Sequence, residues 1–288
     1  WIKFITLYHL IFIVKIKIIM NVCIVGGGLV SITLAKALVN KGIYVDFYSN
    51  QGKLKINKSR TIGISQANID FFNKNILNLK KLLWNINKIE IYSDNLKNEK
   101  ILNFEKKNEN LFSIVKNFDL YKSLKSSLEK DKFFYEKKGQ LKSINDYKLI
   151  INCERNNLLS KKYFYKKLEK KYSSYAHTAI IDHKKISENN IAVQIFTKKG
   201  PLAFLPISNY KTSVVYSARG TKDLEIKSLI KRYNKKYSIL KINQISNFEL
   251  SSLNLRNYHY KNIMAFGDLL HKLHPLAGQG FNMSIRDI

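Results

Sequence analysis

A glycine-rich segment near the start of the chain has the residue types needed to hold a phosphate group. The glycines at 26–28 follow the short β-rich run 21–25 directly, and Ser31 lies at the start of an expected helix. One glycine permits a tight turn, a second lets a pyrophosphate approach the backbone, and the helix N-terminus supplies N–H donors. The segment therefore predicts that Gly26, Gly28 and Ser31 contact a dinucleotide. A glycine-rich turn in another kind of α/β protein is the alternative.

The residue that follows the second expected strand bears on how a nucleotide ribose is held. Dinucleotide folds place an acidic residue there, and its carboxylate accepts hydrogen bonds from the ribose hydroxyls. In this chain the strand is expected at 43–48, and the next residue is the neutral Ser49. A hydroxyl is a weaker acceptor than a charged group. We therefore expect Ser49 to make a single hydrogen bond to the ribose.

A second glycine-containing segment, 267–282, follows an expected strand at 263–266. Asp268 stands at the end of that strand, where a carboxylate is well placed to bind a sugar-like polyol. A helix is expected to start near Asn282, and its N-terminus can stabilise negative charge on a bound ring. Three of the chain's 12 glycines lie in this segment, which argues against the alternative of a loop with glycines by chance.

The elements around these motifs indicate an α/β fold. The strand at 21–25, a helix at 31–40 and the strand at 43–48 form the β-α-β opening of a parallel sheet. From 174 to 217 the pattern changes to closely spaced β-rich runs separated by turns, which favours an antiparallel sheet. Further helices are expected at 66–83, 119–130, 161–172 and 223–237, and further strands at 89–92, 101–104, 133–135, 141–144, 149–152 and 248–250.

This order of elements predicts a discontinuous dinucleotide-binding domain with an inserted substrate domain. We assign 20–155 and 245–288 to the first and 172–244 to the second, an antiparallel β-sheet. Residues 1–19 precede Met20 and are expected to be a non-native or disordered leader, with a membrane-contacting segment as the alternative. The chain ends within an expected helix, which favours a C-terminal truncation.

Composition excludes several classes of protein. The hydrophobic share of 45% suffices for an ordinary core, so a wholly disordered chain is excluded. Lys plus Arg is 50 against 21 Asp plus Glu, giving a net charge of +29, yet only six of the 50 are Arg. Sequence-specific nucleic-acid binding would favour more Arg. The two cysteines lack metal-site spacing, so we expect no metal and reduced thiols in a cytoplasmic protein.

The two glycine segments together resemble those of FAD-dependent aromatic monooxygenases. The resemblance is closest to the ubiquinone-biosynthesis hydroxylases, which act on polyprenylated phenols. The C-terminal segment is similar to the family's Gly-Asp…His-Pro…Gly-Gln-Gly-x-Asn stretch. Four other segments agree with the family, namely 59–65, 115–120, 199–206 and 285–287.

The resemblance implies the fold, the cofactor and the reaction. The fold would be an FAD-binding Rossmann-like domain of the glutathione-reductase/para-hydroxybenzoate-hydroxylase type with the inserted β-sheet substrate domain. NAD(P)H would reduce FAD, and O₂ would form a flavin hydroperoxide that hydroxylates a polyprenylated phenol in ubiquinone biosynthesis. The implied partners are that phenol and either a peripheral membrane contact on the inner face or a complex of the pathway.

The resemblance also assigns roles to residues. His274 and Pro275 would form the environment of the flavin ring, although structural roles for His271 and His274 are favoured over proton transfer. The FAD-binding residues would be Gly26, Gly28, Ser31, Ser49, Arg60, Asp268, Gly278, Gln279, Gly280 and Asn282.

Three departures from the family keep other functions open. Ser31 replaces a glycine, Ser49 replaces an acidic residue, and Arg155 stands where a glycine is expected. These changes motivate a catalytically impaired member that serves as an assembly or lipid-presenting subunit. A flavoprotein oxidoreductase that acts on another aromatic or isoprenoid substrate is a second alternative. A polyanion-binding protein is a third, and it rests on charge alone.

Overall fold

The chain folds into two compact units, which are described separately. The computed structural model describes residues 21–49, 57–96, 99–105, 109–220, 222–273 and 279–288. Unit 1 comprises the described residues of 1–54, 124–167 and 255–270, and unit 2 comprises those of 55–123, 168–254 and 271–288. The domain boundaries expected at 155, 172 and 245 stay a prediction, and the expected leader at 1–19 lies outside the described residues.

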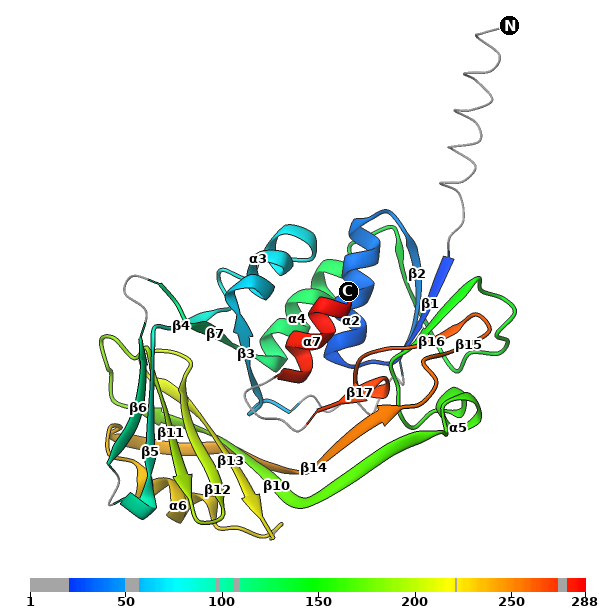
Figure 1. Ribbon diagram of the computed structural model, residues 1–288. Coiled ribbons are helices and arrows are strands. Elements are labelled where there is room, and N and C mark those ends of the chain that lie inside the picture. Colours follow the sequence, from blue (N-terminus) through cyan, green and yellow to red (C-terminus); the bar gives the residue numbers. More distant parts are fainter. Residues whose placement is uncertain (1–20, 50–56, 97–98, 106–108, 221, 274–278) are drawn as a thin grey trace, which may run out of the picture. The chain divides into compact units, whose positions relative to one another are not determined.

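Unit 1 is built on a six-stranded sheet in the order β15-β16-β9-β1-β2-β8 (Figure 1). All its pairs are parallel except that between β15 and β16. The strands are β1 (Asn21–Val25), β2 (Tyr44–Tyr48), β8 (Phe134–Lys137), β9 (Leu149–Asn152), β15 (His259–Tyr260) and β16 (Ile263–Ala265). The helices are α2 (Leu29–Asn40), α5 (Leu158–Tyr163) and the short 3-10 helix η2 (Gly267–Leu269).

The β-rich run that predicted β1 becomes the centre of this sheet. Val22, Cys23 and Ile24 are all buried, because β1 has a parallel neighbour on each side and is covered on its faces. Helix α2 contacts β1 and β2, and its buried residues include Ile32 and Val39. The expected β-α-β opening is therefore present, and it brings the ends of β1, β2 and β9 to one edge.

Unit 2 contains an eight-stranded sheet in the order β17-β14-β10-β13-β12-β11-β5-β6. Its strands are β5 (Lys88–Ser93), β6 (Lys100–Glu105), β10 (Lys167–His183), β11 (Ile191–Thr197), β12 (Gly200–Pro206), β13 (Lys211–Arg219), β14 (Ile239–Leu255) and β17 (His271–Lys272). Helix α6 (Ile226–Tyr233) packs Ile226 and Ile230 into a core formed with the side chains of these strands, among them Leu202 and Phe204. This sheet includes the antiparallel region that the turns predicted.

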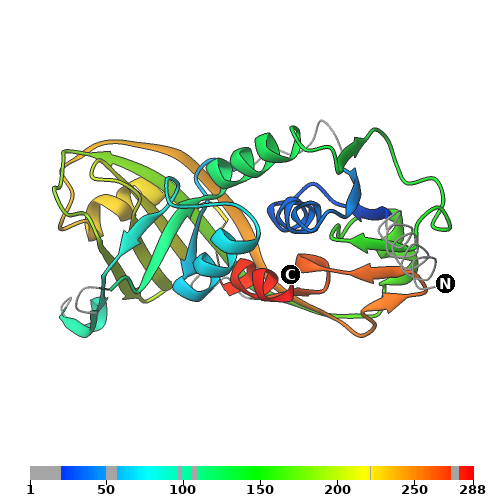
Figure 2. The ribbon, with the colours of Figure 1, turned by 90° about the horizontal axis from the view of Figure 1, so that it is seen from above.

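A smaller sheet in the order β3-β7-β4 completes unit 2. Its strands are β3 (Thr61–Ser65), β4 (Trp84–Ile86) and β7 (Phe112–Lys116). Helices α3 (Gln66–Asn75) and α7 (Gln279–Asp287) contact each other and β3, and Figure 2 shows the two helices side by side. The 3-10 helix η1 (Asp94–Leu96) precedes β6, and α4 (Asn117–Leu128) follows β7, with its residues from Leu124 onward in unit 1.

Some sequence-based element boundaries were wrong. The helix expected at 161–172 ends at Tyr163, and the following residues enter the long strand β10. The strand expected at 248–250 is part of β14, which begins at Ile239. The Lys-rich stretches carry no clear period of their own, so pairing between long strands decides their conformation. The strand expected at 141–144 does not form, and the helix expected at 66–83 ends at Asn75.

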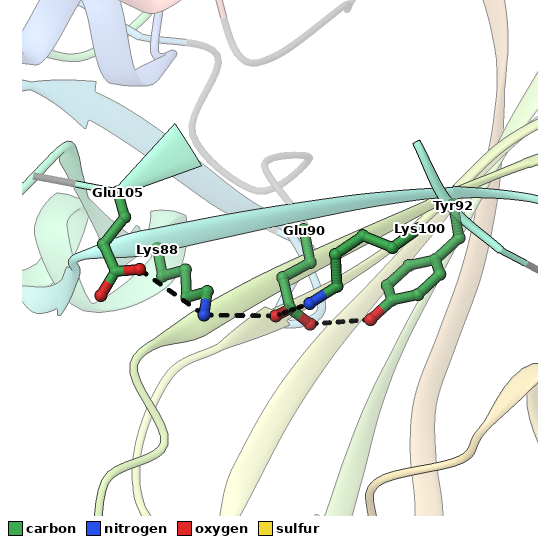
Figure 3. A network of polar contacts seen from close by, with 5 residues as sticks. All are labelled: Lys88, Glu90, Tyr92, Lys100 and Glu105. Atoms are coloured by element: carbon green, nitrogen blue, oxygen red, sulfur yellow. Dashed lines mark hydrogen bonds and ion pairs between the residues drawn. The ribbon is translucent and has the colours of Figure 1, made fainter. Parts of the chain in front are cut away.

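The exposed edge of the large sheet carries a network of charges (Figure 3). On β5, Glu90 accepts a 2.7 Å hydrogen bond from Lys100 on the edge strand β6 and a 2.9 Å bond from Tyr92. Partial burial would raise the pKa of Glu90, but these bonds and the charges of Lys100 and Lys88 outweigh it and lower the pKa. Charged residues on an edge strand oppose edge-to-edge association, so we assign this network a structural role.

The turn between β11 and β12 provides a test of the large sheet. Gly200 has φ +142°, and a Cβ built there would lie 2.0 Å from the Ser217 carbonyl oxygen. Gly220 also has a positive φ, +95°, but a Cβ there meets nothing within 4 Å. We expect Gly200→Ala to lower the free energy of unfolding by more than about 3 kcal/mol and Gly220→Ala by about 1 kcal/mol, measured by urea denaturation. Equal effects would contradict the close approach of β12 and β13 at Gly200.

Candidate functional site

The glycine turn of unit 1 is held at the ends of three strands. Gly26 has φ +135°, and its N–H donates a 2.9 Å hydrogen bond to the carbonyl of Tyr48 at the end of β2. A Cβ at Gly26 would lie 3.1 Å from the Cβ of Cys153, which follows β9. Both the backbone angle and this close neighbour therefore require glycine, and they fix where α2 begins.

Gly28 leaves open space in front of α2. It is the residue before the helix, and a Cβ built on it would meet nothing within 4 Å. The first backbone N–H groups of a helix have no partner within the helix, so they can bind an anion in such a space. The predicted phosphate-binding role of Gly28 fits this geometry. The buried hydroxyl of Ser31 instead donates a 2.8 Å hydrogen bond to the Gly28 carbonyl, within the helix.

Asp268 is held beside the start of α2. The preceding Gly267 has φ +61°, and a Cβ there would lie 2.7 Å from Cγ1 of Val30 in the first turn of α2. Glycine at 267 therefore permits η2 to pack against α2, while the Asp268 side chain is exposed. An exposed carboxylate next to an open helix N-terminus is positioned to accept hydrogen bonds from polyol hydroxyls.

Cys153 is a neighbour of this site that the sequence did not single out. It is partly buried after β9, and its N–H donates a 2.8 Å bond to the carbonyl of Val25 at the end of β1. Burial raises the pKa of its thiol, and the carboxylates of Asp268 and Glu154 raise it further. Two carboxylates therefore lie near the same thiol. The sequence did hold one signal for this residue. Cys153 comes directly after an expected strand, as Gly26 does, and the ends of parallel strands meet at one edge of a sheet.

The loop from β9 to α5 is fixed by a polar network. The buried Asn152 donates to Oγ of Ser160 at 2.9 Å and accepts from Asn157 at 2.8 Å. Its side-chain oxygen also accepts from the backbone N–H of Glu154 at 3.2 Å. Asn157 in turn caps α5 by accepting from the Ser160 N–H. The backbone beside Cys153 and Glu154 is therefore rigidly placed.

Ser49 has a charged partner that sequence reasoning missed. Ser49 is buried after β2, and its Oγ donates a 3.1 Å hydrogen bond to Oε1 of Glu136 on β8. The other oxygen of Glu136 accepts from Lys125 of α4 at 2.5 Å. No local signal could have joined Ser49 to Glu136, because the two residues are 87 positions apart and meet only through the pairing of β2 with β8.

Unit 2 holds the remaining predicted residues that the structure describes. Arg60 is exposed just before β3, and its guanidinium lies 4.9 Å from the centre of the Phe248 ring. The Arg60 carbonyl accepts a 3.0 Å bond from the N–H of Asn117, the first residue of α4. These contacts fix the backbone at Arg60 and leave its exposed side chain as a candidate anion contact.

Asn282 anchors the last helix of the chain. Its side-chain N–H₂ donates to the Gly63 carbonyl at 2.7 Å, and its side-chain oxygen accepts from Asn68 at 2.8 Å and from the Ser65 N–H at 3.2 Å. These bonds join α7 to β3 and α3, so Asn282 positions the helix start. Its predicted contact with a cofactor stays a prediction.

Of the other predicted residues, the structure describes Gln279, Gly280 and His271. Gln279 and Gly280 are the first two residues of α7, and a Cβ at Gly280 would meet nothing within 4 Å. His271 on β17 lies 3.3 Å from the Asp287 carboxylate, measured from Nε2, which agrees with a structural role. His274, Pro275 and Gly278 lie outside the described residues.

Sequence comparison relates the chain to ubiquinone-biosynthesis enzymes. It is 27% identical over 161 residues to the mitochondrial ubiquinone biosynthesis monooxygenase COQ6 of Mus musculus, covering 41% of this chain and 34% of the relative. It is 26% identical over 127 residues to the ubiquinone hydroxylase UbiL of Rhodospirillum rubrum, covering 40% and 29%. The chain thus spans about a third of the length of the curated relatives it matches. No family model matches the chain.

Comparison with solved structures decides the fold. PqsL, a probable FAD-dependent monooxygenase of Pseudomonas aeruginosa, matches with a TM-score of 0.71 at 16% identity. The match covers 93% of this chain and 83% of PqsL. The p-nitrophenol 4-monooxygenase PnpA of Pseudomonas putida matches with 0.74 at 12% identity, covering 93% and 78%. The fold is that of the FAD-dependent monooxygenases. The predicted fold class and the resemblance to ubiquinone hydroxylases are confirmed.

The geometry of unit 1 fits an FAD molecule. The backbone N–H groups at the start of α2, in front of which Gly28 leaves open space, are donors for a pyrophosphate, and the exposed carboxylate of Asp268 is an acceptor for ribityl hydroxyls. One structure of similar fold, HpxO of Klebsiella pneumoniae, is complexed with FAD and matches with a TM-score of 0.70 at 11% identity, covering 93% of this chain and 79% of HpxO. The prediction of FAD as the cofactor agrees with the cofactor of these structures of similar fold.

The helices that the structure describes include none long and apolar enough to cross a bilayer. This finding does not test the expected location in the cytoplasm, which stays a prediction.

The thiol of Cys153 reports on the carboxylate of Asp268. We expect Asp268→Asn to lower the pKa of Cys153, which increases the thiolate fraction and speeds alkylation by iodoacetamide at mildly alkaline pH, by roughly two- to tenfold. The modified cysteine is identified by mass spectrometry, because the buried Cys23, whose pKa is raised to about 12, should stay unreactive. Asp287→Asn is the control, and an equal rate in both variants would contradict the proximity of Asp268 to Cys153.

Proposed function

We propose that this protein is an FAD-dependent aromatic monooxygenase that hydroxylates a polyprenylated phenol in ubiquinone biosynthesis, with NAD(P)H and O₂ as co-substrates. The observation that carries the proposal is the open space at Gly28 before α2, together with the packing of η2 against that helix at Gly267, which places the exposed Asp268 nearby. A Rossmann-type sheet with these groups at its carboxyl edge is suited to a dinucleotide. The substrate class is supported by the names of the relatives COQ6 and UbiL.

Two groups of unit 1 have a definite task in this proposal. The N-terminus of α2 would bind the pyrophosphate through backbone N–H groups, and Asp268 would accept hydrogen bonds from the ribityl hydroxyls. FAD, when bound, supplies the redox chemistry that transfers electrons from NAD(P)H to O₂ for hydroxylation of the phenol. The predicted FAD contacts of Arg60, Gln279 and Gly280 in unit 2 stay predictions, as do those of His274 and Pro275.

A titration with FAD tests the cofactor assignment. We expect saturable binding by the full 288-residue chain, followed as quenching of flavin fluorescence, and loss of that binding in Gly28→Val. The valine side chain would occupy the pyrophosphate space without meeting protein atoms at its Cβ, so the thermal unfolding temperature should stay unchanged. Asp268→Ala should also abolish saturable binding, because the ribityl chain loses its charged partner.

The controls separate loss of binding from loss of structure. Asp223→Ala removes an exposed carboxylate in unit 2 and should leave FAD affinity unchanged. Wild-type affinity in Gly28→Val or Asp268→Ala would contradict the residue roles. Binding of FAD by the wild type without phenol-stimulated oxidation of NAD(P)H would favour the assembly or lipid-presenting subunit, whereas stimulation by an unprenylated aromatic alone would favour another substrate.

We also propose that the protein reaches its polyprenylated substrate by peripheral contact with an anionic membrane surface. Two adjacent segments of unit 1, 158–167 and 256–261, form the candidate surface, joined by stacking of Tyr163 on Tyr260 with ring centres 4.4 Å apart. The two segments contain six Lys and Arg residues and no acidic residue. Four large side chains are exposed there, Leu158 by 70%, Tyr165 by 64%, Tyr258 by 60% and Tyr260 by 40%. Exposed aromatic and basic side chains together suit a lipid interface.

Vesicle binding tests this surface. The triple variant K161E/K162E/K166E should bind phosphatidylserine-containing vesicles at least about tenfold more weakly than the wild type in co-sedimentation, because each basic residue near the surface contributes about 1 kcal/mol. The control K227E/K231E/K235E makes the same change of charge on exposed positions at α6 and should retain most of the binding. Equal losses in both variants would mean that net charge, rather than this surface, controls binding.

A further inference from the structure

The neutral residue after β2 lies against a carboxylate supplied by another strand. Phe47 of β2 is paired with Glu136 of β8, so their side chains share one face of the sheet. Ser49 lies two residues after Phe47 and therefore points to that same face. The 3.1 Å hydrogen bond from Ser49 Oγ to Glu136 Oε1 follows from this register.

Other contacts fix the Glu136 carboxylate in place. Lys125 of α4 donates to Oε2, which leaves Oε1 as the oxygen that faces Ser49. The Glu136 side chain is 27% exposed, so its carboxylate is accessible to a ligand at the sheet edge. Lys125 also lies 3.8 Å from Glu129 one helical turn away, but that carboxylate is 56% exposed.

This pair lies next to the glycine turn. The carbonyl of Tyr48, the residue before Ser49, accepts the N–H of Gly26 at 2.9 Å. In a dinucleotide site the ribose of the adenosine half lies between the glycine turn and the end of the second strand. A ribose hydroxyl at this place can donate to Glu136 directly or to a Ser49 oxygen whose own proton is held by Glu136.

We propose that Glu136, held by Lys125 and acting together with Ser49, is the acidic group that binds the adenosine ribose of FAD in this protein. The acidic residue of the ribose site is then supplied by the neighbouring strand β8 instead of by the end of β2. The substitution of serine at position 49 then retains a charged acceptor for the ribose. This inference rests on the proposed binding of FAD.

The test measures recognition of the ribose hydroxyls separately from overall FAD affinity. ADP and 2′,3′-dideoxyadenosine 5′-diphosphate compete with FAD in the fluorescence titration on the full chain. We expect the wild type to prefer ADP by about tenfold or more, because a hydrogen bond to a charged group is lost with the hydroxyls. Glu136→Gln should abolish this preference by weakening ADP alone, and binding of the dideoxy analogue should stay unchanged.

Two further variants distinguish recognition from structure. Glu129→Gln removes the other carboxylate near Lys125 and should keep the preference for ADP. In the Glu136→Gln background, Ser49→Asp should restore the preference, because it returns a carboxylate to the end of β2. Persistence of the preference in Glu136→Gln, or its absence in the wild type, overturns the proposal.

The outcome is distinguishable from failure of the proposed function. A wild-type chain that binds no FAD overturns the proposed function, and the two diphosphates are then titrated directly by calorimetry. A wild type that binds FAD but shows no role for Glu136 overturns only the present inference. Equal weakening of both diphosphates in Glu136→Gln, with a lowered unfolding temperature, assigns Glu136 a structural role and also overturns it.

Discussion

The parallel pairing of β1 with both β2 and β9 is the constraint on which the rest of unit 1 depends. Because all three strands run in one direction, Gly26, Ser49 and Cys153 reach the same edge of the sheet. Two backbone hydrogen bonds hold that edge together, from Gly26 to Tyr48 and from Cys153 to Val25. The open N-terminus of α2 is a consequence of this arrangement, because the turn at Gly26 makes the helix begin at this edge of the sheet.

Two acidic side chains lie near the carboxyl edge of the unit 1 sheet, and each is held there by different contacts. Asp268 is brought in by Gly267, where only a residue without Cβ allows η2 to meet Val30. Glu136 is brought in by β8 and is balanced by Lys125. A chain with a net charge of +29 therefore concentrates negative groups where hydroxyls of a nucleotide or a ribityl chain would need acceptors. This local arrangement is more informative about the ligand than the overall charge.

Two asparagine side chains, one in each unit, hold the backbone of a predicted site segment in place. Asn282 joins α7 to β3 and α3 through three hydrogen bonds. Two of them are to backbone groups of β3, and the third is to the side chain of Asn68 in α3. An asparagine in a glycine-rich motif can therefore be essential because it positions a helix start. The same holds for Asn152 beside the glycine turn, whose amide organises the loop that carries Cys153.

The sequence by itself determined the elements and motifs whose signals are local. The β-rich run at 21–25 and the glycines at 26–28 were enough to predict the dinucleotide-type sheet, whereas the roles of Gly28 and Asp268 toward a ligand stay predictions. Only the tertiary structure decided that Ser31 bonds within its helix and that Ser49 is joined to Glu136. It also decided that the Lys-rich residues after Tyr163 enter a long strand. The physical reason is that these outcomes depend on pairing between strands distant in sequence, and neither periodicity nor composition records which strands become neighbours.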